Sequence, residues 1–227
     1  MKNAQPDLPQ KQPFLLRKEN RYLWYILIFP AYLIAFFLEE HLITQAVWIT
    51  DLPIDRLIPF CKYFSIPYVL WYPLLVCVGL FLLVRDHDGF KRYMTYIGVS
   101  FFTVVIFYAL VPNQQTLRDM CDLSGNDLFT KIIVWIHAAD TDLNVCPSIH
   151  VVGSLAALFA VFESPAIGRR WPKAAVCVSA FVISISTLFI KQHGILDLLI
   201  AVPYSIAMYF IVYRLIFRRR EKPAAGS

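Results

Sequence analysis

Long apolar stretches alternate with shorter polar segments along this chain of 227 residues. Six of these stretches approach the roughly 20 residues that a helix needs to cross about 30 Å of hydrocarbon. They cover Tyr22 to Leu38, Ile66 to Val84, Tyr93 to Val111, Ser148 to Phe162, Ala174 to Ile190 and Ile195 to Phe217. The fourth stretch is the shortest. The pattern predicts an all-α fold, a polytopic membrane bundle of six transmembrane helices.

One further apolar segment is too short to span a membrane. Leu128 to Ala138 follows the turn signal Ser124-Gly125-Asn126-Asp127, and Lys131 and His137 interrupt its apolar residues. Such a short segment after a polar turn is typical of a helix at the membrane surface. We therefore expect an outward interfacial helix between helices three and four.

Composition places the chain among membrane proteins. Hydrophobic residues make up 58% of it, charged residues 16%, and the mean hydropathy is +0.57. The interior of a soluble domain of this length could not bury so many large apolar side chains. No internal repeat is visible. We expect one six-helix catalytic membrane domain over residues 21–217, with a disordered cytoplasmic tail over 1–20 and a basic cytoplasmic tail over 218–227.

Lysine and arginine gather on one side of the predicted membrane. With six spans, the two termini share a side with the second and fourth loops, and that side holds sixteen of the 21 cations. Because lysine and arginine near helix ends stay in the cytoplasm, both termini are expected there. The remaining loops are expected outside a cell membrane. The net charge of +5 thus indicates topology, and no motif indicates nucleic-acid binding.

The five cysteines do not form a regular disulfide framework. Cys77 and Cys177 lie in apolar stretches, and we interpret them as small buried side chains. Among the outward cysteines, Cys121 and Cys146 are the nearest pair in sequence. One disulfide between them stays an open alternative.

The first candidate for chemistry is the polar segment Lys191-Gln192-His193-Gly194-Ile195-Leu196-Asp197, between the last two apolar stretches. If a helix begins near Gly194, His193 and Asp197 are four residues apart and share one face. The carboxylate can then accept the Nδ1 proton of the imidazole, which leaves Nε2 free to attack an electrophile. A short polar loop with a hydrogen-bonded interfacial histidine is the simpler alternative.

The second candidate is Asn144-Val145-Cys146-Pro147-Ser148-Ile149-His150, at the start of the fourth apolar stretch. We expect Pro147 in the first helical turn, where its missing N–H is not needed. The amides of the next three residues would then point outward, and with the Ser148 hydroxyl they would form an anion site. His150 lies close enough to such an anion to donate a proton.

Arg118 and Lys191 are the candidate cations for this anion. Arginine offers planar, permanently charged donors that suit a phosphate, although Arg118 alone also fits an ordinary solvated or lipid-facing residue. A metal site would need further ligands at the same level. His41, His137 and Asp140 lack ligand spacing, so no metal and no cofactor are expected.

At these residues the chain resembles the membrane branch of the type-2 phosphatidic acid phosphatase superfamily. Pro147-Ser148-Ile149-His150 is similar to its motif Pro-Ser-x-His, and Ser186, His193 and Asp197 are similar to Ser-Arg-x5-His-x3-Asp. Arg118 would belong to the first motif, Lys-x6-Arg-Pro. Four positions depart from the family pattern, namely Val111, Asp119, Ile149 and Thr187. The combination of Cys-Pro-Ser-Ile-His with Lys-Gln-His-x3-Asp is similar to the subgroup that includes inositol phosphorylceramide synthases.

The resemblance implies a metal-independent lipid phosphatase that works through a phosphohistidine. His193 would be the nucleophile, Asp197 would orient it, and His150 would protonate the leaving oxygen. Arg118, Ser148 and Lys191 would bind the phosphate. The expected substrate is a phosphate monoester or diphosphate of a phospholipid or an isoprenoid-type lipid, attacked on the extracytoplasmic side.

Three other functions remain open. Because members of the similar subgroup transfer phospho-head groups between lipids, transfer is an alternative to hydrolysis. A non-catalytic lipid-binding or transport protein could use the same cavity. An intramembrane serine protease would need a nucleophile facing His193, for which Gly153-Ser154 is the only indication.

Overall fold

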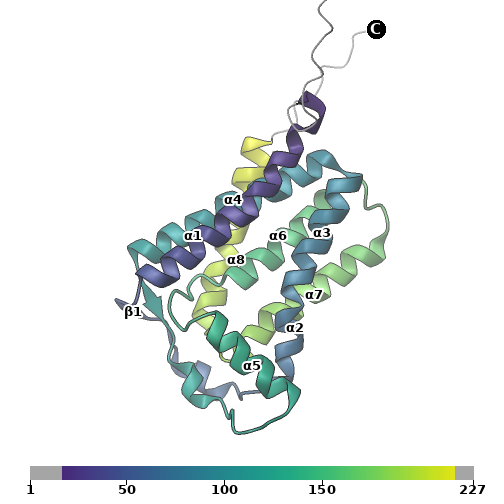
Figure 1. Ribbon diagram of the computed structural model, residues 1–227. Helices are drawn as coiled ribbons and strands as arrows, with labels where there is room; N and C mark the ends of the chain where they lie inside the picture. Colours follow the sequence, from purple (N-terminus) through teal and green to yellow (C-terminus); the bar gives the residue numbers. More distant parts are fainter. Residues whose placement is uncertain (1–16, 218–227) are drawn as a thin grey trace, which may run out of the picture.

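The computed structural model describes residues 17–217, and this part of the chain is almost entirely helical. Figure 1 shows a bundle in which both ends of the described chain lie at the same end, which we call the turn end. The other end, the site end, holds the short strands and α5. The elements are η2 (Lys18–Leu27), α1 (Ile28–Leu42), β1 (Trp48–Ile49), η3 (Pro53–Leu57), η4 (Lys62–Phe64), α2 (Ser65–Val69), α3 (Trp71–Arg85), α4 (His87–Leu110), β2 (Asn113–Gln114), η5 (Leu117–Met120), α5 (Leu128–Ala139), α6 (Ile149–Glu163), α7 (Arg170–Phe189), α8 (Ile195–Tyr209) and η6 (Phe210–Ile216).

Five helical segments within the described residues are long and apolar enough to cross a membrane. They are Lys18–Leu42, Lys62–Arg85, His87–Leu110, Arg170–Phe189 and Ile195–Ile216. Each contains one of the apolar stretches predicted from the sequence, apart from a residue or two at the stretch ends. The membrane character of the chain follows from these helices.

Several helices begin earlier than the apolar pattern predicts, because polar caps and turns extend them. Residues 18–20, assigned to the tail, already belong to the first helical segment. α4 begins at His87 rather than Tyr93, since the Asp86 carboxylate accepts the Gly89 amide proton at 2.8 Å and caps the helix. The remainder of the predicted tails, residues 1–16 and 218–227, lies outside the described residues.

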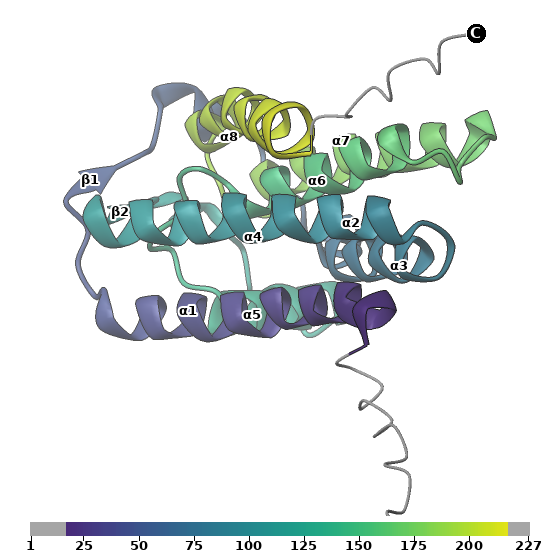
Figure 2. The ribbon, with the colours of Figure 1, turned by 90° about the horizontal axis from the view of Figure 1, so that it is seen from above.

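The fourth predicted span corresponds to α6, a helix of 15 residues. At 1.5 Å per residue it is about 22 Å long, shorter than the hydrocarbon layer. It packs against α3, α4, α7 and α8, so it is the central helix of the bundle. Figure 2 shows the surrounding layers, with α1 and α8 on opposite sides of α4.

Small residues allow α3 to approach α6 closely. A Cβ atom on Gly153 would lie 2.7 Å from Cζ2 of Trp71, so glycine is required where the indole crosses the helix. Ala156, Ala157 and Ala160 continue the small-residue surface of α6 and are buried. Close approach of helices through small side chains is the usual packing mode in membranes.

At the site end, short polar connections tie distant segments together. β1 pairs in parallel with β2, with Trp48 opposite Asn113 and Ile49 opposite Gln114. α5 begins where the sequence predicts a helix, because the Asp127 carboxylate accepts the amide protons of Phe129 and Thr130.

All five cysteines are free. Cys77 and Cys177 are exposed on the outer surface of their helices, so the prediction that they are buried is wrong. Their apolar neighbours face outward together with them, because helices that contact lipid carry apolar residues on their outer surface too. Cys121 and Cys146 do not pair; the Cys121 thiol lies 3.9 Å from the Ile190 carbonyl oxygen instead.

Candidate active site at the helix ends

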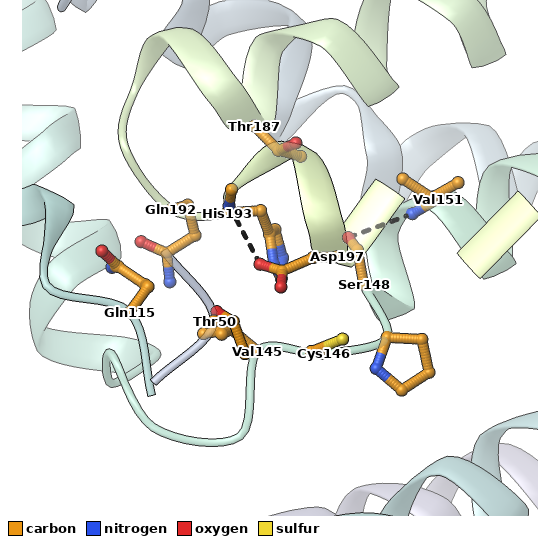
Figure 3. Close-up of polar contacts among 12 residues, drawn as sticks. Thr50, Gln115, Val145, Cys146, Ser148, Val151, Thr187, Gln192, His193 and Asp197 are labelled. Atoms are coloured by element: carbon orange, nitrogen blue, oxygen red, sulfur yellow. Dashed lines mark hydrogen bonds and ion pairs between the residues drawn. The ribbon is translucent and has the colours of Figure 1, made fainter. Parts of the chain in front are cut away.

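The His193 and Asp197 side chains form a buried pair at the start of α8. His193 Nδ1 lies 3.2 Å from Asp197 Oδ2, and the residues are 5% and 0% exposed. The same carboxylate oxygen accepts the Gly194 amide proton at 2.9 Å. Asp197 therefore both caps the helix and orients the imidazole. Figure 3 shows the pair with Cys146, Ser148 and Thr187 around it. The predicted four-residue contact is present.

His150 faces the same place from the start of α6. Its ring centroid lies 5.7 Å from that of His193, and the two rings are tilted by 59°. Tyr68 and Trp71 pack on its other sides, with ring centroids 4.3 Å and 4.6 Å away. The Nε2 atoms of both histidines are buried and have no hydrogen-bond partner within the described chain. Two unpaired imidazole nitrogens in one place indicate a ligand site, because buried polar atoms are normally hydrogen-bonded.

A cavity of about 280 Å³ leads from the two histidines toward the outer surface. Aromatic side chains of α1, α3 and α5 dominate its wall. Phe37 and Trp135 line it and are also 56% and 57% exposed, so the cavity opens sideways between α1 and α5. If these helices face lipid, an acyl or isoprenoid chain can enter from the bilayer. A mostly apolar cavity with a few convergent polar groups is the usual form of a small-molecule site.

Asp55, on η3, holds the turn that carries His193. Its Oδ1 accepts the Ile195 amide proton and its Oδ2 the Leu52 amide proton, both at 2.7 Å. A Cβ on Gly194 would lie 2.9 Å from Asp55 Oδ2, so the turn approaches this carboxylate closely. Asp55 is 1% exposed. The sequence analysis missed it, because it lies 140 residues away from its partner.

Lys191 also ties the histidine turn to the segment that contains Asp55. Its Nζ donates to the carbonyl oxygens of Asp55 at 2.9 Å and Ile58 at 2.6 Å. The residue is 1% exposed, and its φ of 59° places it in the left-handed region. Burial lowers the pKa of the Lys191 ammonium, while the neighbouring Asp55 opposes that shift. Lys191 does not line the cavity.

Arg118 lies beside the C-terminal end of α5. Its Nη2 donates to the carbonyl oxygens of Asp140 at 2.6 Å and Thr141 at 2.7 Å, and to Gln192 Oε1 at 2.9 Å. Nη1 donates to the His137 carbonyl at 3.3 Å. A cation at these carbonyls also complements the negative end of the helix dipole. Arg118 is absent from the lining of the cavity.

Ser148 caps α6 rather than facing the cavity. Its Oγ accepts the Val151 amide proton at 3.4 Å, and its own amide donates to the Asp197 carbonyl at 3.3 Å. The helix begins at Ile149, so the prediction that Pro147 occupies the first helical turn is wrong. The reason is the capping bond of Ser148, which fixes the helix start two residues later.

Asn113 was also missed by the sequence analysis and organises the segment before α6. Its side-chain oxygen accepts the amide protons of Val145 at 3.0 Å and Cys146 at 2.8 Å, and its Nδ2 donates to the Cys146 carbonyl at 3.1 Å. The polar run after Pro112 was the available signal, since a fully buried asparagine requires partners. Asn113 thereby places the histidine helix relative to α4.

Asp140 is a carboxylate within the cavity wall. Tyr68 donates its hydroxyl proton to Asp140 Oδ2 at 3.1 Å. Burial raises the pKa of the Asp140 carboxyl, and His193 and the Tyr68 hydrogen bond oppose that shift. The residues described contain no group of three or more histidine, cysteine or acidic side chains placed to hold a metal. Of the six predicted site residues, only His150 and His193 line the cavity.

Comparisons with family models, with curated proteins and with solved structures find no match to this chain.

Proposed function

We propose that this protein is a membrane-embedded enzyme that moves a phosphoryl group from a lipid through a phosphohistidine at His193. The carrying observation is the pair of buried, unpartnered Nε2 atoms of His150 and His193 in one lipid-accessible cavity, with Asp197 on the other nitrogen of His193. An oriented nucleophile with a second titratable group beside it is the usual arrangement for covalent catalysis.

The chemistry follows from the contact of Asp197 with Nδ1 of His193, which leaves Nε2 of that ring free. Asp197 holds a proton on His193 Nδ1, so the lone pair lies on Nε2, which faces the cavity and attacks phosphorus. Asp197 also stabilises the imidazolium that forms. His150 donates its proton to the departing oxygen and later removes one from the acceptor hydroxyl. The charge that develops at phosphorus lies near the positive N-terminal end of α6.

The acceptor is water in a phosphatase and a lipid hydroxyl in a phosphotransferase. Hydrolysis is the expectation from the sequence. Transfer is the second candidate, and it is favoured by the low exposure of His193, 5%, and by the sideways opening of the cavity. Both features limit access of bulk water and admit a second lipid. Phosphate binding by Arg118, Ser148 and Lys191 stays a prediction; their polar atoms hold the backbone around the histidines.

Phosphoenzyme trapping tests the assignment of roles. His193→Ala should form no labelled intermediate from a lipid phosphate or from nitrophenyl phosphate, since the attacking atom is absent. His150→Ala should lose about 10²–10⁴-fold on the lipid but far less on nitrophenyl phosphate, whose leaving group needs no proton. The measurement is the initial rate together with acid-labile label on the protein.

Ser184→Ala is the matched control for these variants. Ser184 lies on α7, outside the motifs, and its hydroxyl donates to the Ala180 carbonyl at 2.7 Å. Its rate should stay within about threefold of wild type, since loss of one such bond changes stability by only about 1 kcal/mol. A label that persists in His193→Ala, or one that maps to His150 or Ser148, contradicts the proposal.

We further propose that α6 forms a sixth, short span, that α5 lies in the outer interface, and that the site faces outward. A cysteine at Leu57, which is 80% exposed at the site end, should react with an impermeant thiol reagent on intact cells. A cysteine at the exposed Gly168 of the turn end should react only after permeabilisation. Labelling of the unsubstituted chain gives the background. The reverse pattern would invert the topology.

A further inference from the structure

The cavity that ends at the two histidines has an unusual charge for a phosphate site. Among its described lining residues there is one carboxylate, Asp140, and no lysine or arginine. The nearby cations Arg118 and Lys191 already donate to backbone carbonyl oxygens. A phosphate monoester carries up to two negative charges, and burying such charge without a cation is costly. The wall therefore disfavours a dianionic head group.

Several aromatic residues share the wall with Asp140, and Trp71, Tyr72 and Trp135 are among them. Tyr68 donates a hydrogen bond to the Asp140 carboxylate. A carboxylate beside aromatic rings is a favourable environment for an ammonium group, which interacts with the negative charge and with the ring faces. On α1, the side-chain oxygen of Glu39 accepts a hydrogen bond from Asn144, another residue of the wall.

We propose that the cavity binds a zwitterionic phosphodiester lipid, with its ammonium group at Asp140 and its phosphate at His150 and His193. This inference rests on the proposed function. It names the substrate class, a phospholipid with an amine in its head group, in place of a phosphate monoester. The phosphate and the ammonium cancel in net charge, so the whole head group enters the cavity without an unpaired charge.

The two observations that carry the inference are independent of each other. The unpartnered Nε2 atoms of the histidines mark the position of the phosphate. The Tyr68–Asp140 hydrogen bond, 3.1 Å long, marks a carboxylate near the His150 ring, since Tyr68 also packs on that ring. A head group that joins a phosphate to an amine carries one partner for each of these two places.

The reaction balances without another reactant. His193 Nε2 forms a bond to phosphorus, the bond from phosphorus to the glycerol oxygen breaks, and His150 gives that oxygen its proton. Diacylglycerol leaves, and the phosphorylated amino alcohol stays on His193. The hydroxyl of water or of a second lipid then attacks phosphorus, His150 takes its proton, and the N–P bond breaks. Asp140 holds the ammonium group through both steps.

Binding of short-chain lipids to a variant that cannot turn them over tests the proposed head-group selectivity. The full-length His193→Ala protein is titrated with dihexanoyl phosphatidylcholine, phosphatidylglycerol and phosphatidic acid below their micelle concentrations. Trp71 and Trp135 line the cavity, so their fluorescence reports occupancy. We expect the zwitterionic lipid to bind at least tenfold more tightly than either anionic lipid. Equal or tighter binding of phosphatidic acid overturns the proposal.

Substitutions then assign the selectivity to one carboxylate. Asp140→Asn in the same background should weaken phosphatidylcholine binding about tenfold or more and leave phosphatidylglycerol unchanged, and Asp140→Glu should recover part of it. Asp142→Asn is the matched control, because Asp142 accepts from Gln114 at 3.0 Å and does not line the cavity. An equal loss in both variants, or none in Asp140→Asn, overturns the assignment.

Two further measurements keep the outcomes separate. If Asp140→Asn unfolds, Tyr68→Phe removes only the hydroxyl that orients the carboxylate, and it should weaken phosphatidylcholine binding several-fold; no change counts against the proposal. Phosphoenzyme formation is measured in the otherwise unsubstituted chain with nitrophenyl phosphate and with the nitrophenyl ester of phosphocholine. Absence of label with both esters refutes the proposed function even where the ammonium selectivity is observed, whereas label without selectivity refutes only the present inference.

Discussion

The two ends of the bundle differ in where their polar groups are buried. At the turn end, the main polar cluster joins Glu163 to the Tyr209 hydroxyl at 2.6 Å and to Arg214 at 2.8 Å, and the Arg214 side chain is 53% exposed. At the site end, Asp55, Lys191 and Asp197 are each at most 1% exposed. Burial of so many polar groups is costly and is retained only with partners or for function. The difference in burial favours the site end as the place of the proposed chemistry.

The largest effect is expected where one carboxylate has two tasks. The same oxygen, Asp197 Oδ2, contacts His193 Nδ1 and accepts the Gly194 amide proton. In Asp197→Asn, an amide oxygen in that place keeps both contacts but no longer stabilises the imidazolium, whereas an NH₂ group there loses the Gly194 bond and forces the proton onto Nε2. Both orientations weaken the nucleophile, and we expect turnover of nitrophenyl phosphate to fall about 10³–10⁴-fold. A rate near wild type would contradict the role of Asp197, and the melting temperature of the variant shows whether the fold is retained.

An intermediate effect is expected at Asp55, which supports the site without lining the cavity. Asp55→Asn keeps one acceptor for two amide protons, from Leu52 and Ile195. An unpaired buried amide costs about 1–3 kcal/mol, and the histidine turn should loosen. We expect kcat to fall about 10–100-fold with little change in KM, measured by steady-state kinetics and thermal unfolding.

Asp51→Asn is the control for the Asp55 variant, because Asp51 lies in the same segment between α1 and α2. Asp51 accepts from the exposed Thr116 at 2.5 Å, away from the histidine turn. Its rate should change by less than about twofold. If both substitutions reduce kcat equally, the Asp55 effect is a general loss of structure in that segment rather than positioning.

The smallest effect is expected at the turn end. Glu163→Gln removes a partly exposed ion pair with Arg214, and such pairs contribute about 0–1 kcal/mol. Activity should stay within about twofold, and the melting temperature should fall by roughly 2–4 °C at most. A tenfold loss of activity here would show that the two ends are coupled, which would break the comparison.

Local spacing predicted part of the site, and long-range contacts determined the rest. The pair of His193 and Asp197 follows from helical periodicity, which needs only four residues. The positions of the long helices follow from apolar stretches, which depend on composition. Asp55 and Asn113 were missed because their partners lie far along the chain, where sequence pattern carries no information about contact.

The two predicted cations show a different limit. A sequence gives the charge of Arg118 and Lys191 but not what their donors contact. In the folded protein both lie against carbonyl oxygens, Arg118 at the end of α5 and Lys191 on η3. Helix ends and irregular segments leave carbonyls unsatisfied, and a nearby cation satisfies them before any ligand binds. Their neighbours, rather than their charge, decide how they act.

The bond from Ile195 to Asp55 also has a consequence for the order of assembly during synthesis. It joins residues 140 positions apart, one before the second long helix and the other at the start of the last. Domains that depend on such distant contacts complete late, since the ends must meet after the intervening chain is in place. The histidine turn therefore takes its final form only when the last helix has been made and inserted. In the proposed mechanism, a chain that lacks its last helix also lacks the paired His193 and Asp197, so it could not attack a lipid.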